Sequence, residues 1–366
     1  MRFKETVSRV LSAANRLVLA GVLGWSVLAA AGCGASGGGT SGGGGTSGPT
    51  PLAAGGATDI YVVQASATGV PISIQDFAAG SGGSVAPKGT LLPPANFQVQ
   101  SIATDNSGQL YVGGTLGQQT YQYEVLVYAA GATGSATPAR TLILADYQGQ
   151  GFLPIAMTVD GSGLLYVVGL GNVATYAATA NGTSVPASFF TLGSSYTGVG
   201  GIAVDSTGNI YLSNFIATQT SLSGELLVYA AGASGSATPV RTIPTNGVPY
   251  GVALDASGDI YTPAVVETGP VLGPVTFVSA EVEEFAGGTA GSAVPMKTLT
   301  GPGTLTYAAA AKVDSVGNLY LLTVGGGSTG MPEVMEFGPG VRGADAPAVV
   351  LTSGSWTGTG AQLAVH

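Results

Sequence analysis

One short motif recurs along most of this chain: an Asp, two variable residues, a Gly, one further residue, then an apolar residue and a Tyr. An Asp at the first position of a turn accepts backbone N–H groups, and a Gly closes the turn. Apolar runs such as IAVD and IYLS flank the motif, so each copy predicts a tight β-hairpin. The five copies begin at Asp105, Asp160, Asp205, Asp255 and Asp314.

A second motif is an aromatic residue followed ten residues later by Pro, with a connector close to AAGASGSATP between them. Together the two motifs divide the chain into units of four short apolar runs. Repetition of such a unit about every 50 residues is typical of a β-propeller. The six copies are Phe77/Pro87, Tyr128/Pro138, Tyr176/Pro186, Tyr229/Pro239, Phe285/Pro295 and Phe337/Pro347.

The two ends of the chain explain why there are five hairpin motifs but six connectors. Residues 362–366 align with 201–205, and residues 58–61 align with 208–211. The C-terminus therefore supplies the inner strand of a blade whose other three strands come from the N-terminus, which leaves no free edge in the ring. We predict an all-β fold, a six-bladed β-propeller of four antiparallel strands per blade over residues 58–366.

The run GIAVDSTGNIYLSN at 201–214 resembles an NHL repeat, and this resemblance covers residues 58–366. The superfamily also contains six-bladed gluconolactonases and senescence-marker proteins, so the resemblance implies the fold rather than one activity. A gluconolactonase-like activity would imply metal-binding Glu, Asn and Asp at the mouth of the central channel. Among the residues that end the predicted second strands, only Asn214 is of a suitable type. Carboxylates without a recognisable constellation remain at Asp59, Asp259 and Glu267.

The N-terminal segment predicts export. Residues 1–16 carry the positive charge, and 17–31 form an uninterrupted apolar run, which is short for a membrane-spanning helix of about 20 residues. The sequence Ala30-Ala31-Gly32-Cys33 resembles a bacterial lipobox, which implies a signal peptide over 1–32 and lipidation at Cys33; ordinary cleavage after Ala31 and an uncleaved anchor are the alternatives. Residues 33–57 are rich in Gly, Ser and Thr and predict a flexible tether.

Charge and cysteine content exclude several kinds of partner. Residues 1–32 hold four basic side chains and one acidic side chain, which leaves 6 basic and 18 acidic side chains and a net charge of −12. Such a surface repels phosphate backbones and anionic lipid. One Cys and one His exclude an intrachain disulfide and zinc or copper sites with several His or Cys ligands. We expect a monomer without metal or cofactor, held to a bacterial envelope membrane through its lipid, the leaflet being undetermined.

The two ends of the predicted ring differ. The hairpin motifs and the connectors lie at one end, which we call the hairpin face. The connections from second to third strand, and from one blade to the next, lie at the other end, the loop face, and they vary in length: about 11 residues at 113–123 and about 19 at 262–280. Variable loops on a repeated scaffold are where specificity is usually placed. Large aromatic residues on these connections either stack on a ligand or pack between blades: Tyr196, Tyr250, Tyr307 and Trp356.

Lys312 departs from the pattern of the inner strands. The second residue before the turn Asp is small elsewhere, and it is Lys only here. A Lys near the channel either binds a carboxylate or acts as a base of lowered pKa, or it runs its stem along the channel into water. The equivalent residues are Ala103, Thr158, Ala203, Ala253 and Ala364.

Two further sets of charged residues recur. The hairpin aspartates, with His366 at the sixth position, would form a ring that either binds calcium or caps the individual turns. Basic residues recur two positions after the connector Pro, and glutamates recur four positions before the connector aromatic. This recurrence on outer strands predicts cross-strand ion pairs or a solvated rim. A ring of basic residues that binds a ligand is the alternative. The recurrent residues are Lys88, Arg140, Arg241 and Lys297, and Glu124, Glu225, Glu281 and Glu333.

No active site emerges from these motifs. There is no G-x-S-x-G elbow, and a Ser-His-Asp system would have to use the terminal His366. The leading hypothesis is a non-enzymatic, envelope-anchored propeller that recognises a protein, peptide or glycan through the loop face. The alternatives are a metal-dependent lactonase of the gluconolactonase type and a surface scaffold without a pocket.

Overall fold

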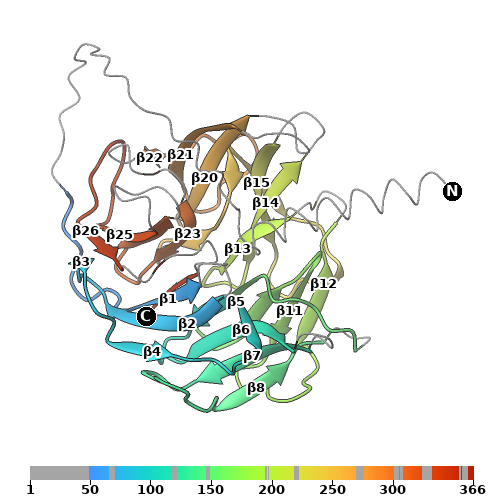
Figure 1. The fold of residues 1–366 in the computed structure, drawn as a ribbon. Coiled ribbons are helices and arrows are strands. Elements are labelled where there is room, and N and C mark those ends of the chain that lie inside the picture. Colours follow the sequence, from blue (N-terminus) through green and yellow to red (C-terminus); the bar gives the residue numbers. More distant parts are fainter. Residues whose placement is uncertain are drawn as a thin grey trace, which may run out of the picture.

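Six small β-sheets, each with a four-stranded antiparallel meander, stand around a central axis in the part of the chain that the structure describes (Figure 1). The structure is a computed structural model that describes residues 49–65, 71–117, 122–145, 149–193, 196, 198–217, 222–268, 276–300, 305, 308–323, 332–353, 356 and 362–366. These residues form no helix, and so none of them makes a helix long and apolar enough to cross a membrane. The prediction of an all-β, six-bladed propeller is confirmed.

Each blade is a meander that runs from the axis to the rim. From inside to outside, blade I is β27 (Leu363–Val365), β1 (Asp59–Ala65), β2 (Pro71–Ala78) and β4 (Gly89–Leu91). Blade II is β5 (Phe97–Thr104), β6 (Leu110–Leu116), β7 (Gln122–Tyr128) and β8 (Arg140–Ile143). Blade III is β9 (Ala156–Val159), β10 (Leu165–Val168), β11 (Asn172–Tyr176) and β12 (Ser188–Thr191).

The second half of the ring repeats this order. Blade IV is β13 (Val199–Val204), β14 (Ile210–Ala217), β15 (Leu222–Tyr229) and β17 (Arg241–Thr245). In blade V the inner strand is interrupted, so that β18 (Val248–Pro249) and β19 (Ala253–Leu254) both pair with β20 (Ile260–Thr268), followed by β21 (Thr276–Phe285) and β22 (Lys297–Leu299). Blade VI is β23 (Ala308–Val313), β24 (Leu319–Thr323), β25 (Glu333–Phe337) and β26 (Val349–Thr352).

The ring closes as the alignment of the chain ends predicts. The C-terminal strand β27 pairs antiparallel with β1, with Ile60 opposite Val365 and Val62 opposite Leu363. Figure 1 shows the C-terminus beside β1, inside a blade whose other strands come from the start of the propeller. Ring closure therefore joins two segments that are about 300 residues apart in the sequence.

Apolar side chains fill the spaces between neighbouring blades. One cluster joins Val63 and Ile74 of blade I to Val112 and Leu126 of blade II, and further clusters repeat this arrangement around the ring. The aromatic residue that precedes each connector lies at the end of the third strand and is at most 1% exposed in every blade. Burial of a large side chain at a fixed place in each blade is the physical reason for this half of the motif.

The connectors join each blade to the one before it, which the sequence analysis did not predict. A Gly six residues after the buried aromatic lies parallel to the outer strand of the preceding blade, as in the short strands β3 (Gly83–Ser84) and β16 (Gly235–Ser236). Gly291 makes the same contact by donating its N–H to Thr242 O at 2.9 Å. These glycines have φ between 55° and 74°, a conformation that favours Gly. The pairs are Leu351/Gly83, Leu91/Gly134, Leu142/Gly182, Phe190/Gly235 and Leu299/Gly343.

Residues 53–57, the end of the predicted tether, lie against the hairpin of blade VI. Ala53 N–H donates to Asn318 Oδ1 at 2.7 Å, and Ala57 N–H donates to Asp314 Oδ2 at 3.0 Å. A Cβ on Gly56 would approach Asp314 Oδ2 to 2.1 Å, so only Gly fits there. The part of the predicted flexible segment that the structure describes is thus in contact with the propeller, because polar backbone groups find partners on the hairpin face.

Candidate functional site

On the hairpin face, each turn aspartate accepts hydrogen bonds from backbone N–H groups of its own turn. Asp205 Oδ1 accepts the backbone N–H groups of Thr207 and Asn209, both at 2.9 Å, and Tyr211 Oη donates to Oδ2 at 3.3 Å. Burial raises the pKa of Asp205, but hydrogen bonds from Asn209 and Thr207 outweigh this and hold that pKa below its ordinary value. The same two backbone bonds recur in the other four hairpins, at Asp105, Asp160, Asp255 and Asp314. The capping interpretation is confirmed for all five turns, and Asp314 in addition accepts the N–H of Ala57.

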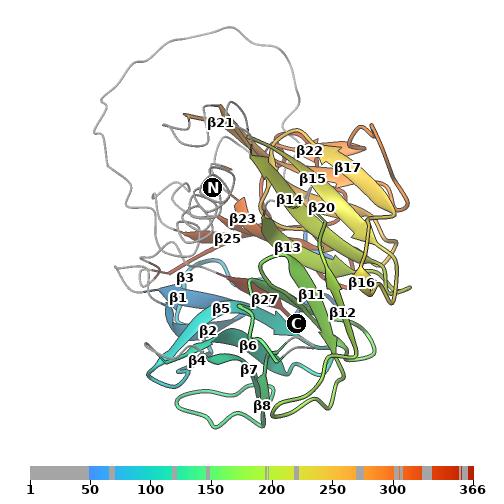
Figure 2. The ribbon, with the colours of Figure 1, turned by 90° about the vertical axis from the view of Figure 1, so that its right-hand side faces the viewer.

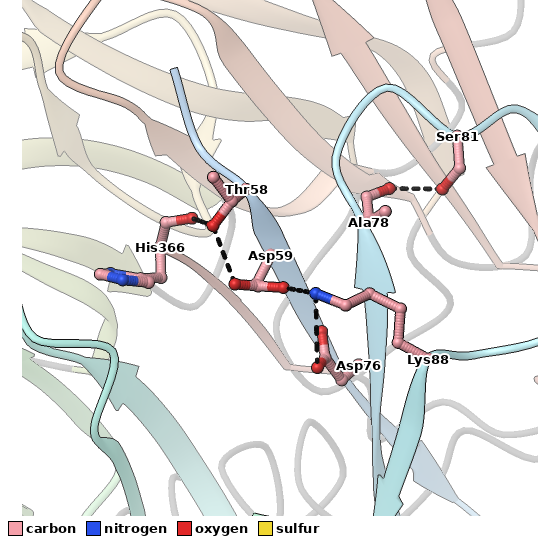
Figure 3. A network of polar contacts seen from close by, with 7 residues as sticks. All are labelled: Thr58, Asp59, Asp76, Ala78, Ser81, Lys88 and His366. Carbon is pink, nitrogen blue, oxygen red and sulfur yellow. Dashed lines mark hydrogen bonds and ion pairs between the residues drawn. The ribbon is translucent and has the colours of Figure 1, made fainter. Parts of the chain in front are cut away.

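His366 occupies the sixth turn position through its backbone. Its C=O accepts Asp59 N–H and its N–H donates to Asp59 O, both at 3.0 Å. Figure 3 shows the imidazole directed away from Asp59, whose carboxylate instead forms an ion pair with Lys88. The Lys88 ammonium also lies 3.9 Å from Asp76. His366 is therefore part of the ring closure here.

The recurrent cations stabilise the blades, but the predicted pairing with the recurrent glutamates is wrong. Arg241 donates to Tyr211 Oη at 2.6 Å and to Thr289 O in the connector of the next blade at 3.3 Å. Its guanidinium stands 5.4 Å from the Tyr211 ring centroid, and Arg140 repeats the arrangement on Tyr111. Lys297 does form a cross-strand ion pair, at 2.6 Å, with Glu284. The strand register explains the difference, because it sets Glu124 opposite Ile143, Glu225 opposite Pro244 and Glu333 opposite Thr352.

The central channel is narrow. Its cavity measures about 60 Å³, which is room for about four or five waters, whereas a drug-sized ligand occupies a pocket of roughly 300 Å³ or more. The inner strands approach closely here: a Cβ on Gly201 would lie 2.9 Å from the Gly251 Cα, and one on Gly200 would lie 2.7 Å from the Tyr250 carbonyl carbon. Small residues at the axis thus bring the backbones together and exclude large ligands from the described part of the channel.

Lys312 lines this cavity, and Ser101, Tyr250 and Gln362 are the other residues with polar side chains around it. The register confirms the equivalence that the repeats predict, since Lys312 lies opposite Tyr320 as Ala103 lies opposite Tyr111 and Ala203 opposite Tyr211. Desolvation by burial lowers the pKa of Lys312. Among the described residues, no hydrogen bond or ion pair to the Lys312 ammonium is found.

The predicted aromatic set is spread over three environments. Trp356 is only 2% exposed; it meets Phe77 edge-on at 5.4 Å, and its Nε1 donates to Gln75 Oε1 at 2.8 Å. Tyr196 is partly buried among the side chains between blades III and IV, and burial raises its pKa. Tyr250 lines the channel, and Tyr307 lies outside the described residues. The structure therefore does not bring the three described rings, Trp356, Tyr196 and Tyr250, together on one surface.

Two of the residues considered for a gluconolactonase-like site, Asp259 and Glu267, lie at opposite ends of β20. Asn214 is fully buried on β14 and donates to Glu225 Oε1 at 2.9 Å. Asp259 precedes β20 on the hairpin face and accepts Gly287 N–H at 2.9 Å, while Glu267 lies near the other end of β20. Eight residues of extended strand separate these two carboxylates by about 26 Å. In the described ranges, no three His, Cys, Asp or Glu side chains are placed to share a metal ion.

The longest hairpin of the structure projects on the loop face. β20 has nine residues and β21 has ten, and they remain paired as far as Thr268 and Thr276 (Figure 2). Much of the long connection predicted at 262–280 is therefore strand, because its β-branched and aromatic residues favour extended backbone. Near its end Phe277 and Val278 are 43% and 55% exposed. Composition alone does not reveal this apolar projection, since an apolar run predicts a buried strand as readily as an exposed one.

Two fully buried carboxyls predict how stability depends on pH. Burial is the main cause that raises the pKa of Glu336 and of Glu283 to about 7, from an ordinary value of 4.5. Between these values the folded chain holds more protons than the unfolded chain, so the free energy of unfolding falls as pH rises. We expect the free energy of unfolding in urea to be higher at pH 5 than at pH 8, by on the order of 2 kcal/mol for each of the two carboxyls.

A Glu336→Gln variant separates this effect from other titrations. Gly80 N–H donates to the Glu336 carboxyl at 2.9 Å, and a Gln side chain can accept the same bond without binding a proton. The variant should therefore show a smaller loss of stability between pH 5 and pH 8. A wild-type midpoint that rises over this range would contradict the assignment.

Comparison with known proteins supports the fold and leaves the function open. No protein-family model matches the chain, and no curated protein matches it by sequence. A protein of unknown function from Bacteroides caccae has a similar structure, with a TM-score of 0.53 and 10% identity over 84% of this chain and 98% of that chain.

Weaker similarities add no argument. A protein described as an oxidoreductase (glucose dehydrogenase) from Thermus thermophilus has a TM-score of 0.42 and 14% identity, over 82% of this chain and 96% of that chain. YCF48 from Cyanidioschyzon merolae has a TM-score of 0.45 and 9% identity, over 81% of this chain and 86% of that chain. The chain is a six-bladed β-propeller, and its chemistry has to be judged from its own residues.

Proposed function

We propose that the chain is an exported, lipid-anchored propeller of the NHL-like type that recognises a protein or peptide through its loop face and catalyses no reaction. The observation that carries the proposal is the β20–β21 hairpin, which exposes Phe277 and Val278 on the loop face. Exposed apolar side chains on a projecting element are typical of a surface that contacts another macromolecule. Leu92 and Leu170 add two more exposed apolar side chains to this face.

The contrast between the two faces supports this choice of surface. On the hairpin face, the turn aspartates cap their own turns, Arg140 and Arg241 bind tyrosines, and the connectors pair with the preceding blade. These polar groups therefore form their hydrogen bonds within the propeller. The loop face carries the elements that differ from blade to blade, from the three-residue link after β10 to the β20–β21 hairpin.

A protein or peptide fits this surface better than a glycan does. Sugar recognition favours several exposed aromatic side chains side by side, and Trp356 and Tyr196 are packed inside the propeller rather than exposed beside Phe277. A net charge of −12 after residue 32 adds attraction for basic segments of a partner. The lactonase alternative gains no support, since Asn214 is fully buried and donates to Glu225, and Asp259 and Glu267 lie at opposite ends of β20.

The proposed anchor is compatible with this orientation. Residues 1–33 lie outside the described residues, so the lipid at Cys33 rests on the sequence alone. The chain enters the propeller on the hairpin face, where Ala53 and Ala57 bind Asn318 and Asp314. A tether that leaves from this face places the loop face at the opposite end of the ring, where a partner can reach it.

Site-specific photo-cross-linking tests the proposal within a single blade. A benzophenone amino acid at position 278 should yield an adduct with a defined protein in source cells, because Val278 is exposed on the loop face. The matched control is position 294 in the connector of the same blade, where Val294 is 82% exposed on the hairpin face, and it should yield no such adduct. Phe277→Ser should weaken the adduct at position 278.

The outcomes distinguish the alternatives. Equal adducts at positions 278 and 294, or none at either, would favour a surface scaffold, and adducts with polysaccharide would favour a glycan ligand. Fractionation of the same cells reports on the anchor, because Cys33→Ser should move the chain out of the membrane fraction.

A further inference from the structure

We propose that the central channel is a binding site for one small carboxylate, of the size of formate or acetate, with the Lys312 ammonium as its counter-ion. This site is distinct from the loop face and does not depend on recognition there. The proposal rests on a lysine that lines a small cavity, in which none of the described lining residues is acidic.

The charge distribution around the cavity is the first argument. The chain has 19 acidic and 10 basic side chains, yet none of the described residues that line the cavity is acidic, and Lys312 is the single basic one among them. Burial lowers the pKa of Lys312, which indicates a surrounding that solvates the ammonium poorly. An unpaired ammonium in such a place is unfavourable, and a bound anion would offset that cost.

The other residues at the axis show that Lys312 is not required for packing. The equivalent positions in four other blades are Ala103, Ala203, Ala253 and Ala364, each facing the Tyr of its second strand as Lys312 faces Tyr320. A small residue therefore suffices at this place in the fold. Lys312 is of intermediate exposure and lines the cavity, so an ion in the channel can reach it.

Size and polarity select the ligand. A cavity of about 60 Å³ admits an ion of three or four heavy atoms, but it excludes a sugar acid. Ser101, Tyr250 and Gln362 add polar side chains, while Ile102, Met157 and other apolar residues complete the lining. In a carboxylate with at most one methyl group, the charged oxygens match the Lys312 ammonium and the few polar side chains, and the methyl group matches the apolar part of the lining.

Thermal unfolding of the full chain in a neutral detergent tests the site. Sodium formate and sodium acetate are titrated against sodium gluconate at constant sodium concentration, since gluconate carries the same charge but is too large for the cavity. Formate or acetate should raise the melting temperature by several degrees in a saturable manner, because a ligand that binds only the folded chain stabilises it. Gluconate should give only the small, unsaturable response expected of a salt.

Two variants show whether Lys312 is responsible. Lys312→Met keeps the length of the side chain and removes the charge, so the response to acetate should disappear. Lys88→Met removes an exposed lysine on the hairpin face and should leave the response intact. An equal response to acetate in Lys312→Met, or equal effects of acetate and gluconate on the wild type, would overturn the proposal.

A crystallographic measurement covers the case in which Lys312→Met does not fold. Crystals of the wild-type chain soaked in bromide, a small anion with an anomalous signal, should show a bromide peak in the channel within about 3.5 Å of the Lys312 ammonium. A channel that holds only water beside Lys312 would show that the lysine is simply solvated, and the proposal would be wrong. Lys312→Ala, which introduces the residue found in the other blades, provides a second charge-free variant for the melting experiment.

Discussion

Deletion of residues 362–366 is expected to unfold the whole propeller rather than one blade. β27 supplies the inner strand of blade I, and Leu363 and Ala364 are at most 2% exposed. Leu363 belongs to the apolar cluster between blades VI and I, and Ala364 to the cluster between blades I and II. Loss of this strand therefore opens two interfaces between blades at once.

The hydrogen bonds of β27 set the size of the effect. Val63 N–H donates to Gln362 O at 3.1 Å, Thr104 Oγ1 donates to Val365 O at 2.7 Å, and His366 exchanges backbone bonds with Asp59. With about 1 kcal/mol for each bond and about 2 kcal/mol for burying Leu363, the loss is on the order of 5 kcal/mol or more. That is comparable to the whole stability of many domains.

Urea unfolding and limited proteolysis of the truncated chain measure this loss. His366→Ala is the control, because it removes the imidazole and keeps the backbone of β27, and it should change the stability by less than about 1 kcal/mol. A truncated chain whose free energy of unfolding in urea lies within about 1 kcal/mol of the wild-type value would show that ring closure contributes little to stability.

Asp314→Ala should be the most damaging of the turn-aspartate substitutions. Asp314 is 9% exposed and accepts Asn318 N–H at 2.9 Å, Asn318 Nδ2 at 2.8 Å and Tyr320 Oη at 3.0 Å. It also accepts the Ala57 N–H, so it fastens residues 53–57 to the ring. Alanine would leave several buried donors without an acceptor, each costing about 1 to 3 kcal/mol, and we expect a total loss of about 4 kcal/mol.

Asp255→Ala is the matched comparison. Asp255 makes the same turn, but it accepts only the Ser257 and Asp259 N–H groups at 2.9 Å and a long bond from Tyr261 at 3.5 Å. Its turn is more exposed, and the expected loss is about 1 to 2 kcal/mol. Urea unfolding of both variants checks the order, and equal losses would mean that the contact with residues 53–57 contributes nothing.

Only part of the candidate site could be predicted from the sequence. Lys312 could be singled out because it breaks a repeat of small residues, and the register of β23 with β24 places it as expected. The width of the channel could not be predicted, since it depends on how closely Gly201 and Gly251 bring two strands together. The burial of Trp356 is of the same kind, because its contact with Phe77 and Gln75 joins blade VI to blade I across the closure of the ring.

The sequence by itself determined the number of blades, the capped turns and the closure of the ring. These features are local or periodic. An Asp and a Gly at fixed spacing make a turn wherever they occur. Because the propeller starts at the second strand of a repeat and ends with a first strand, the last strand can only complete the first blade. Only the tertiary structure decided the contacts between blades, such as the pairing of Gly235 with Phe190, the binding of Arg241 to Tyr211 and Thr289, and the projection of β20 and β21. Those contacts depend on the angle and distance at which twisted sheets pack, which no residue spacing records.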